Sequence, residues 1–280
     1  MQTLRHYLLA VQFFTRIPIT GRLADWVGFS PALLRASSAH FPGVGLLVAL
    51  VAMGIYGALH WALGGGLPAT APLAALVAAV LSTAATVLLT GGFHEDGLAD
   101  VADGLGGSHQ RERALEIMKD SRIGAFGAMA LVLALLAKVA LLALLGAHSL
   151  GAALSALLGA HVLTRFWPLL LVRTMAHVGD TATSKSKPLA DQIGGRALAV
   201  ATLWCFMPLA LVWQAQAALF LIASVVCSAL GAAHVARLLA RRLQGFTGDG
   251  LGAVQQVSEI GFYLGAALAL GAQARWAGAV

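Results

Sequence analysis

Charged residues are unusually scarce in this sequence. Of its 280 residues, 11% are charged and 59% are hydrophobic, and the mean hydropathy is +0.83. Soluble domains carry about 25% charged residues. So few charges cannot cover a water-facing surface, which excludes a soluble globular fold. Lipid must therefore be part of the solvent of this chain.

Cysteine is also scarce, and the alternating pattern of a membrane β-barrel is absent. The two cysteines, Cys205 and Cys227, lie in apolar segments without CxxC or zinc-site spacing. We expect both to be small buried hydrophobic residues. Lipid offers no hydrogen-bond partner to an open backbone, so the membrane-spanning segments must be helices.

Long apolar runs supply those helices, since about 20 apolar residues cross a bilayer. The candidate spans are residues 44–63, 73–90, 127–146, 150–172, 197–213, 217–236 and 255–272. The last contains Glu259 near its start, which leaves six or seven spans. The stretch from Leu4 to Ile19 is interrupted by Arg16 and Pro18 and predicts an amphipathic helix lying on the membrane. The predicted fold is an all-α, polytopic integral membrane helical bundle with an N-terminal interfacial helix, and residues 1–280 form one domain.

The net charge of +6 is explained by membrane topology rather than by nucleic-acid binding. Lys and Arg gather before the first span and in three connections, residues 91–126, 173–196 and 237–254. The alternate connections, residues 64–72, 147–149 and 214–216, contain neither. We therefore expect a cytoplasmic N-terminus and three cytoplasmic loops on the same side.

Acidic residues are rare, and they cluster. The chain has 12, of which seven lie between Glu95 and Asp120. Asp96, Asp100 and Asp103 are spaced four and three residues apart, so on a helix they share one face. Their mutual repulsion would be relieved by Mg²⁺, which prefers carboxylate oxygens and substrate phosphates as ligands.

We therefore predict that these three aspartates bind Mg²⁺, with Glu95 as a candidate fourth ligand. Gly97 and Gly104 leave the backbone open to a closely approaching ligand. One alternative is an exposed acidic helix face. Another is a zinc site around His94, but no second His follows at metal-binding spacing.

A second polar segment follows in the same connection. Lys119 and Arg122 suit phosphate oxygens, and Arg binds them through two parallel hydrogen bonds. Asp120 is a candidate metal ligand or a group that orients a hydroxyl. The alternative is that the two cations only mark the cytoplasmic flank of a span.

Four segments together resemble the cobalamin synthase family, the adenosylcobinamide-GDP ribazoletransferases. They are residues 91–104 (GGFHEDGLADVADG), 118–127 (MKDSRIGAFG), 179–190 (GDTATSKSKPLA) and 247–253 (TGDGLGA), with Glu259 beyond the last. The resemblance implies an enzyme of the inner membrane that requires Mg²⁺. It would join adenosylcobinamide-GDP to α-ribazole, or to α-ribazole 5′-phosphate, and release GMP.

The chemistry of that reaction suggests roles for the residues. Lys119 and Arg122 would stabilise charge on the phosphates. The proton of the attacking hydroxyl would go to Asp120, Asp249 or Glu259, or one of these would complete the metal shell. Lys185 and Lys187 are assigned to cofactor binding. Membrane lipid is an expected partner, and a homo-oligomer is left open.

The rival class of protein is a membrane transporter. Lys138, His161 and Arg165 lie within predicted spans, where ionisable residues often mark a substrate path. They could instead bind the corrin or pair with carboxylates between helices. No inverted repeat is visible, and no GxxxxGK[ST] loop is present to hold a nucleotide.

Overall fold

The computed structural model describes residues 1–64, 66–179 and 193–277, and in these ranges all regular secondary structure except one isolated β-bridge is helical. Seven segments are long and apolar enough to cross a membrane: Pro31–Ala62, Ala71–Thr90, Ala125–His148, Leu150–Thr174, Gly195–Ala215, Ala218–Arg242 and Gly248–Trp276. The polytopic helical bundle predicted from the sequence is confirmed. The last apolar segment is the seventh candidate span.

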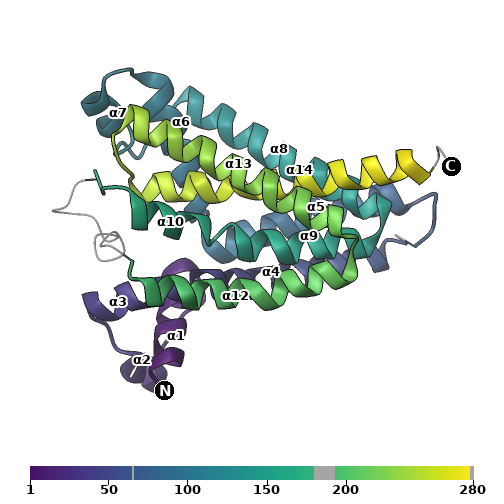
Figure 1. Cartoon of the computed structure of the whole chain (residues 1–280), viewed down its shortest axis with the longest axis horizontal. Coiled ribbons are helices and arrows are strands. Elements are labelled where there is room, and N and C mark those ends of the chain that lie inside the picture. The colour runs from purple at the N-terminus through teal and green to yellow at the C-terminus, as the bar shows by residue number, and fades with distance from the viewer. Residues whose placement is uncertain (65, 180–192, 278–280) are drawn as a thin grey trace.

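Two short helices, α1 (Gln2–Phe14) and α2 (Gly21–Val27), precede the bundle, and a third, α3 (Pro31–Ser37), begins the first candidate span. Figure 1 shows α1 lying across the direction of the long helices, as expected of a helix on the membrane surface. The end of α1 is tied to the bundle, because the backbone N–H of Arg16 donates to the carbonyl of Leu89 at 2.7 Å.

The long helices follow in alternating directions (Figure 1). They are α4 (Phe41–Ala62), α5 (Ala71–Thr90), α8 (Ala125–His148), α9 (Leu150–Leu163), α12 (Gly195–Ala215), α13 (Ala218–Arg242) and α14 (Gly248–Ala277). Small residues fill much of the central core, including Ala49, Ala52, Ala78, Ala152 and Ala156. Small side chains let helix backbones approach closely, which is how helices associate in lipid.

The predicted span 150–172 is divided in the structure. It forms α9 and a separate short helix, α10 (Trp167–Thr174). Pro168 lies in the first turn of α10, where its fixed φ and missing N–H are tolerated. Hydropathy alone did not reveal this break, because the residues on both sides are apolar.

The predicted loop 91–126 is mostly helical. Gly91 and Gly92 adopt φ of 70° and 69°, which reverses the chain after α5. The acidic segment is α6 (Phe93–Gly107), followed by α7 (Arg111–Ile117), and α6 packs on α14 and α8. The predicted loop 237–254 likewise falls mainly within α13 and α14. The polar residues therefore lie on packed helices rather than on free loops.

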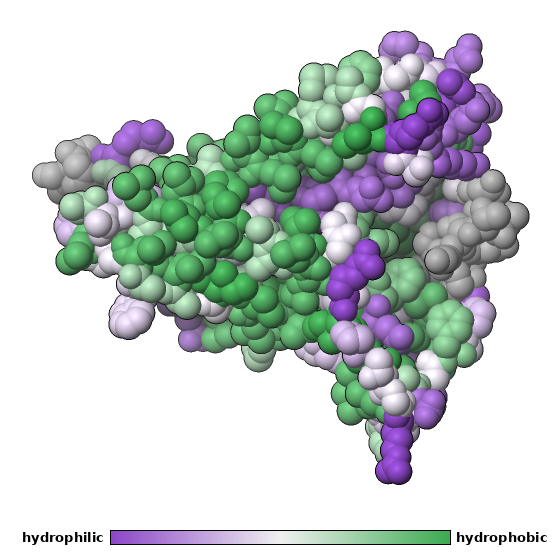
Figure 2. Space-filling view, turned by 180° about the vertical axis from the view of Figure 1, so that it is seen from behind, coloured by the Kyte–Doolittle hydropathy of each residue, from purple (hydrophilic) through white to green (hydrophobic). Residues whose placement is uncertain are grey.

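Polar and apolar surfaces are separated along the bundle. Figure 2 shows a broad hydrophobic surface over the middle of the molecule and a concentration of hydrophilic residues at one end. In Figure 1 that end carries α1, α6 and α7, and the connection between α13 and α14. The connections between α4 and α5, α8 and α9, and α12 and α13 lie at the other end. Two of the three predicted charged segments, residues 91–126 and 237–254, therefore lie at one end, which we call the charged end; residues 180–192 of the third lie outside the described residues.

Candidate active site

The contact between α6 and α14 brings Asp249 next to the aspartates of α6. A Cβ atom on Gly97 would lie 2.7 Å from the backbone oxygen of Asp249, and one on Gly252 would lie 3.1 Å from the backbone oxygen of His94. Gly97 is therefore required for this close approach, and at Gly252 a Cβ atom fits only if its neighbours shift by a few tenths of an ångström. The space at Gly97, predicted to receive a ligand, is occupied by the backbone of α14.

The space at Gly104 is also filled by protein. A Cβ atom there would lie 2.9 Å from the backbone oxygen of Ala114 and would overlap the side chain of Met118. This glycine therefore allows α7 to fold back on α6. The prediction that Gly104 leaves room for a ligand is wrong.

Four aspartates lie close together at this contact: Asp96, Asp100 and Asp103 of α6, and Asp249 of α14. Burial raises the pKa of Asp100 to about 7, helped by the negative charges of Asp249, Asp96 and Asp103. Within the described residues, Asp96, Asp100 and Asp249 make no side-chain hydrogen bond or ion pair. We call Asp96, Asp100, Asp103 and Asp249 the aspartate cluster. No cationic side chain among the described residues relieves the repulsion between their negative charges.

The chemistry of the aspartate cluster fits a hard divalent cation. As the side chains lie, no group of three His, Cys, Asp or Glu residues among those described converges closely enough to hold a metal ion. Mg²⁺, however, is usually held by one or two carboxylates, with substrate phosphates and water completing its shell. Asp96, Asp100 and Asp249, which have no side-chain partner among the described residues, are sufficient for such a site. A zinc site would need further nitrogen or sulfur ligands beside His94, and the described residues do not bring any together with it.

Asp103 has a structural task in addition. Its carboxylate accepts hydrogen bonds from the backbone N–H groups of Gly124 and Gly127 at 2.7 and 2.8 Å. It therefore caps the N-terminus of α8, where unpaired N–H groups and the helix dipole favour negative charge. A Cβ atom on either glycine would overlap this carboxylate. The sequence analysis missed the cap, although two glycines three residues apart before a span were a signal for it.

Asp120 and Arg122 form an exposed pair beside the aspartate cluster. The guanidinium of Arg122 contacts both carboxylate oxygens of Asp120, the shortest contact being 2.6 Å. This hydrogen bonding holds the pKa of Asp120 at about 2. The pair lines an open cleft with Asp103 and Arg113, so Arg122 and one cluster aspartate face the same space.

The other predicted cations are less fully placed. Lys119 lies one residue before Asp120, in the connection between α7 and α8. Lys185 and Lys187 lie outside the described residues. The assigned roles of all three lysines stay predictions.

Glu95 and Glu259 are not in the aspartate cluster; they contact Lys138 inside the bundle. The Nζ atom of Lys138 lies 3.0 Å from Glu259 and 3.9 Å from Glu95. Gln256 donates to Glu95 at 3.0 Å, and Gln255 donates to Glu259 at 2.7 Å. Glu259 is also ten residues beyond Asp249 on α14, which is about 15 Å along a helix. The catalytic role predicted for Glu259 and the metal role predicted for Glu95 remain untested.

His161 and Arg165 complete this interior network. Arg165 donates to the backbone oxygen of His161 at 2.7 Å, and the Nδ1 atom of His161 lies 3.9 Å from Glu259. Lys138, His161 and Arg165 are each 2% exposed. Of the alternatives open at the sequence level, pairing with carboxylates between helices is observed for Lys138, whereas the hydrogen bonds of Arg165 go to His161.

This network predicts a large stability effect at Lys138. Replacing Lys138 with Met leaves Glu259 charged and without its cation, and it also removes the longer contact with Glu95; we expect a cost of about 3–5 kcal/mol. The variant Lys138→Met/Glu259→Gln removes both charges and should recover most of the loss. Thermal unfolding in detergent measures both variants.

The same pair separates a structural role of Glu259 from a catalytic one. If Glu259 is structural, the double variant should also retain group transfer. A double variant that is stable but inactive would instead indicate that Glu259 is catalytic. A single variant as stable as the parent protein would contradict the pairing itself.

The fold and site together define a polytopic helical membrane protein with four clustered aspartates at its charged end, three of them without a side-chain partner among the described residues. The family described as cobalamin-5-phosphate synthase matches residues 6–267, so the chain belongs to that family. This confirms the resemblance drawn from the sequence segments.

Individual relatives agree over nearly the whole chain. The adenosylcobinamide-GDP ribazoletransferase of Polaromonas sp. (strain JS666 / ATCC BAA-500) is 62% identical, over 96% of this chain and 98% of its own. That of Albidiferax ferrireducens is 59% identical, over 96% and 99%. That of Leptothrix cholodnii is 44% identical, over 93% and 94%. No solved structure matches the chain.

Proposed function

We propose that this protein transfers the adenosylcobinamide-phosphate group from adenosylcobinamide-GDP to α-ribazole, or to α-ribazole 5′-phosphate, and releases GMP. The product is adenosylcobalamin or its 5′-phosphate. The observation that carries the proposal is the match to ribazoletransferases over 96% of the chain, at up to 62% identity among those compared. The aspartate cluster supplies a site suited to this chemistry.

The reaction needs positioning and charge neutralisation more than covalent catalysis. A ribose hydroxyl of the acceptor attacks the cobinamide-linked phosphorus, and the bond to the GMP oxygen breaks. Asp96, Asp100 and Asp249 would hold Mg²⁺, which supplies charge neutralisation at the pyrophosphate when bound. Arg122 is placed to exchange Asp120 for a phosphate oxygen in the same cleft.

Asp249 differs from the other two acids predicted either to accept the proton or to complete the metal shell. Asp120 is held by Arg122, and Glu259 by Lys138, Gln255 and Tyr263. Asp249 has no such partner among the described residues, and it lies beside Asp96 and Asp100. Of the two roles predicted for it, we therefore assign Asp249 to the metal shell, together with Asp96 and Asp100.

The transporter alternative is not supported. Its candidate residues, Lys138 and Arg165, are buried in contacts with other protein groups. A test of the enzyme is direct. Purified protein in liposomes should form GMP and the joined product in equal amounts from the two substrates with Mg²⁺. Transport of a substrate without GMP release would contradict the proposal.

We further propose that the charged end faces the cytoplasm, across the inner membrane. The positive-inside rule supports this, since Lys and Arg gather there. With Cys205 and Cys227 replaced by Ala, a single cysteine at Glu112 should react only from the cytoplasmic side. A cysteine at Leu67, which is 63% exposed at the other end, should react only from outside. The reverse labelling pattern would contradict this orientation.

A further inference from the structure

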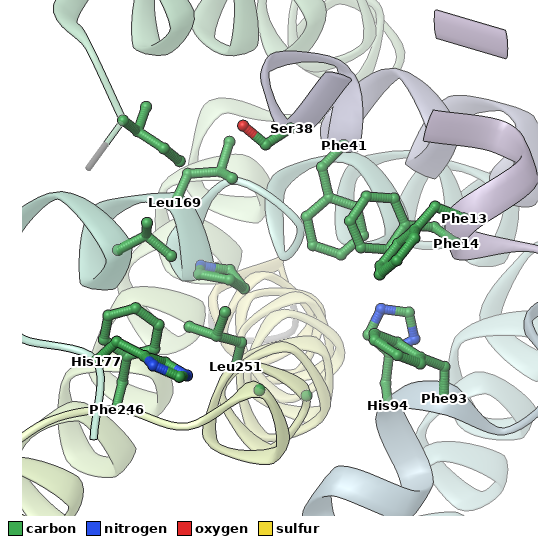
Figure 3. Close-up of a pocket in the computed structure, with 15 residues that line it drawn as sticks. Phe13, Phe14, Ser38, Phe41, Phe93, His94, Leu169, His177, Phe246 and Leu251 are labelled. Carbon is green, nitrogen blue, oxygen red and sulfur yellow. The ribbon is translucent and has the colours of Figure 1, made fainter. Parts of the chain in front are cut away.

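An aromatic pocket opens beside the aspartate cluster, and neither the reaction chemistry above nor the family match assigns it. The centre of a water-sized sphere can occupy about 50 Å³ of this pocket, which is room for a few waters or for one flat ring system. The lining is almost entirely apolar and includes five phenylalanines: Phe13, Phe14, Phe41, Phe93 and Phe246. Figure 3 shows Phe13, Phe14, Phe41, Phe93 and His94 on one side and Phe246, His177 and Leu169 on the other.

The pocket lies against the two helix segments that carry the aspartates. Phe93 and His94 begin α6, about one turn before Asp96 and about two turns before Asp100. Gly248, Leu251 and Gly252 line the pocket from the first turns of α14, on either side of Asp249. A ligand held among the phenylalanines therefore has one edge near the aspartate cluster.

His94 is the polar group that gives this pocket chemical character. The Nε2 atom of His94 is buried and has no hydrogen-bond partner among the described residues. The imidazole is stacked on Phe41, with ring centroids 5.7 Å apart and planes inclined by 8°. A buried polar atom without a partner is costly, so a ligand that pairs with Nε2 gains that hydrogen bond on binding. Flat aromatic surfaces around one polar atom favour a flat, largely apolar ring system.

We propose that this pocket binds the benzimidazole base of the acceptor nucleoside; this assignment rests on the proposed function. Among the reactants, the base is a neutral bicyclic aromatic group with one free ring nitrogen, which can pair with His94. Guanine has several donors and acceptors on its edge, and an apolar pocket would leave most of them unpaired. The corrin is far larger and carries many amides. With its base in the pocket, the acceptor reaches the Asp249 turn through its ribose.

The first test separates acceptor binding from donor binding. Phe93→Ala removes an aromatic wall at a residue that is 41% exposed, so it should fold. Without this ring to stack on the base, the KM for α-ribazole should rise about three- to tenfold. The KM for adenosylcobinamide-GDP, and kcat at saturating α-ribazole, should stay near the parent values. Phe93→Tyr should restore the KM.

A filling variant and a matched control sharpen this test. Val172→Trp places a large ring in the pocket from α10, and it should weaken acceptor binding further. Leu203→Trp adds the same ring on the lipid-facing surface of α12, where Leu203 is 71% exposed, and should change neither KM. Should Val172→Trp fail to fold, Phe93→Ala alone decides the question.

Free 5,6-dimethylbenzimidazole provides the second test. It should compete with α-ribazole but not with adenosylcobinamide-GDP, and Phe93→Ala should weaken that inhibition. An active parent enzyme with an unchanged acceptor KM in Phe93→Ala would overturn the pocket assignment alone. So would co-purification of a lipid chain whose removal leaves acceptor binding unaltered. A parent protein that transfers no group at all would instead overturn the proposed function.

Discussion

Asp100→Asn should reduce group transfer by about 10²–10³-fold or more, a loss typical of removing one group that stabilises the transition state. Asn keeps the size of the side chain and removes its charge. Asp100 is the aspartate whose pKa responds to all three neighbours, so it is central to the cluster. Membrane insertion should be normal, because Asp100 makes no hydrogen bond or ion pair within the described residues. The measurement is GMP release per enzyme molecule.

The neighbours of Asp100 should respond in two distinct ways. Asp96→Asn and Asp249→Asn should lose activity without losing stability. Asp103→Asn should also destabilise the protein, by about 0.5–2 kcal/mol, because the charge at the N-terminus of α8 is lost. Glu112→Gln is the matched control, since this side chain is 82% exposed and pairs only with Arg111 among described residues. Near-normal transfer by Asp100→Asn at saturating Mg²⁺ would contradict the site.

Arg122→Lys should also lose most of its turnover, about 10²-fold, while inserting normally. In the structure the guanidinium of Arg122 contacts both oxygens of Asp120, and its side chain is 87% exposed. A phosphate can replace Asp120 in that geometry, because both are bidentate acceptors. Lys keeps the charge but lacks the planar pair of donors.

The same variant decides between the two interpretations of Arg122. A residue needed only for membrane topology obeys the positive-inside rule equally well as Lys. Arg113→Lys is a suitable control, since Arg113 lines the same cleft and pairs with Glu116 on α7. Full activity of Arg122→Lys would leave Arg122 as a topology residue.

Hydropathy and spacing were sufficient for the fold class and for part of the site. The seven spans follow from apolar length, and the shared face of Asp96 and Asp100 follows from helical periodicity. The break between α9 and α10 did not, because it interrupts the backbone without interrupting the apolar run. Only Pro168 marks it locally.

Pairings between helices were beyond the sequence. Asp249 and Glu259 were equal candidates there, since both are acids near the last span. The two acids lie in different surroundings because α14 approaches α6 closely at Gly97 and Gly252. This approach brings Asp249 next to the aspartates of α6. The same helix then turns Glu259 toward Lys138. The register of one helix against another depends on where small side chains allow a close approach. Those contacts join segments that are far apart in the chain.

The central claim is that the aspartates of α6 and α14 bind the divalent cation that the reaction uses. Mn²⁺, which shares the ligand preferences of Mg²⁺, reports its own binding through electron paramagnetic resonance. Purified protein with adenosylcobinamide-GDP should bind Mn²⁺ in competition with Mg²⁺. Asp100→Asn should lose that binding, and Glu112→Gln should retain it. Mn²⁺ binding that is equal in the parent protein and in Asp100→Asn would contradict the account.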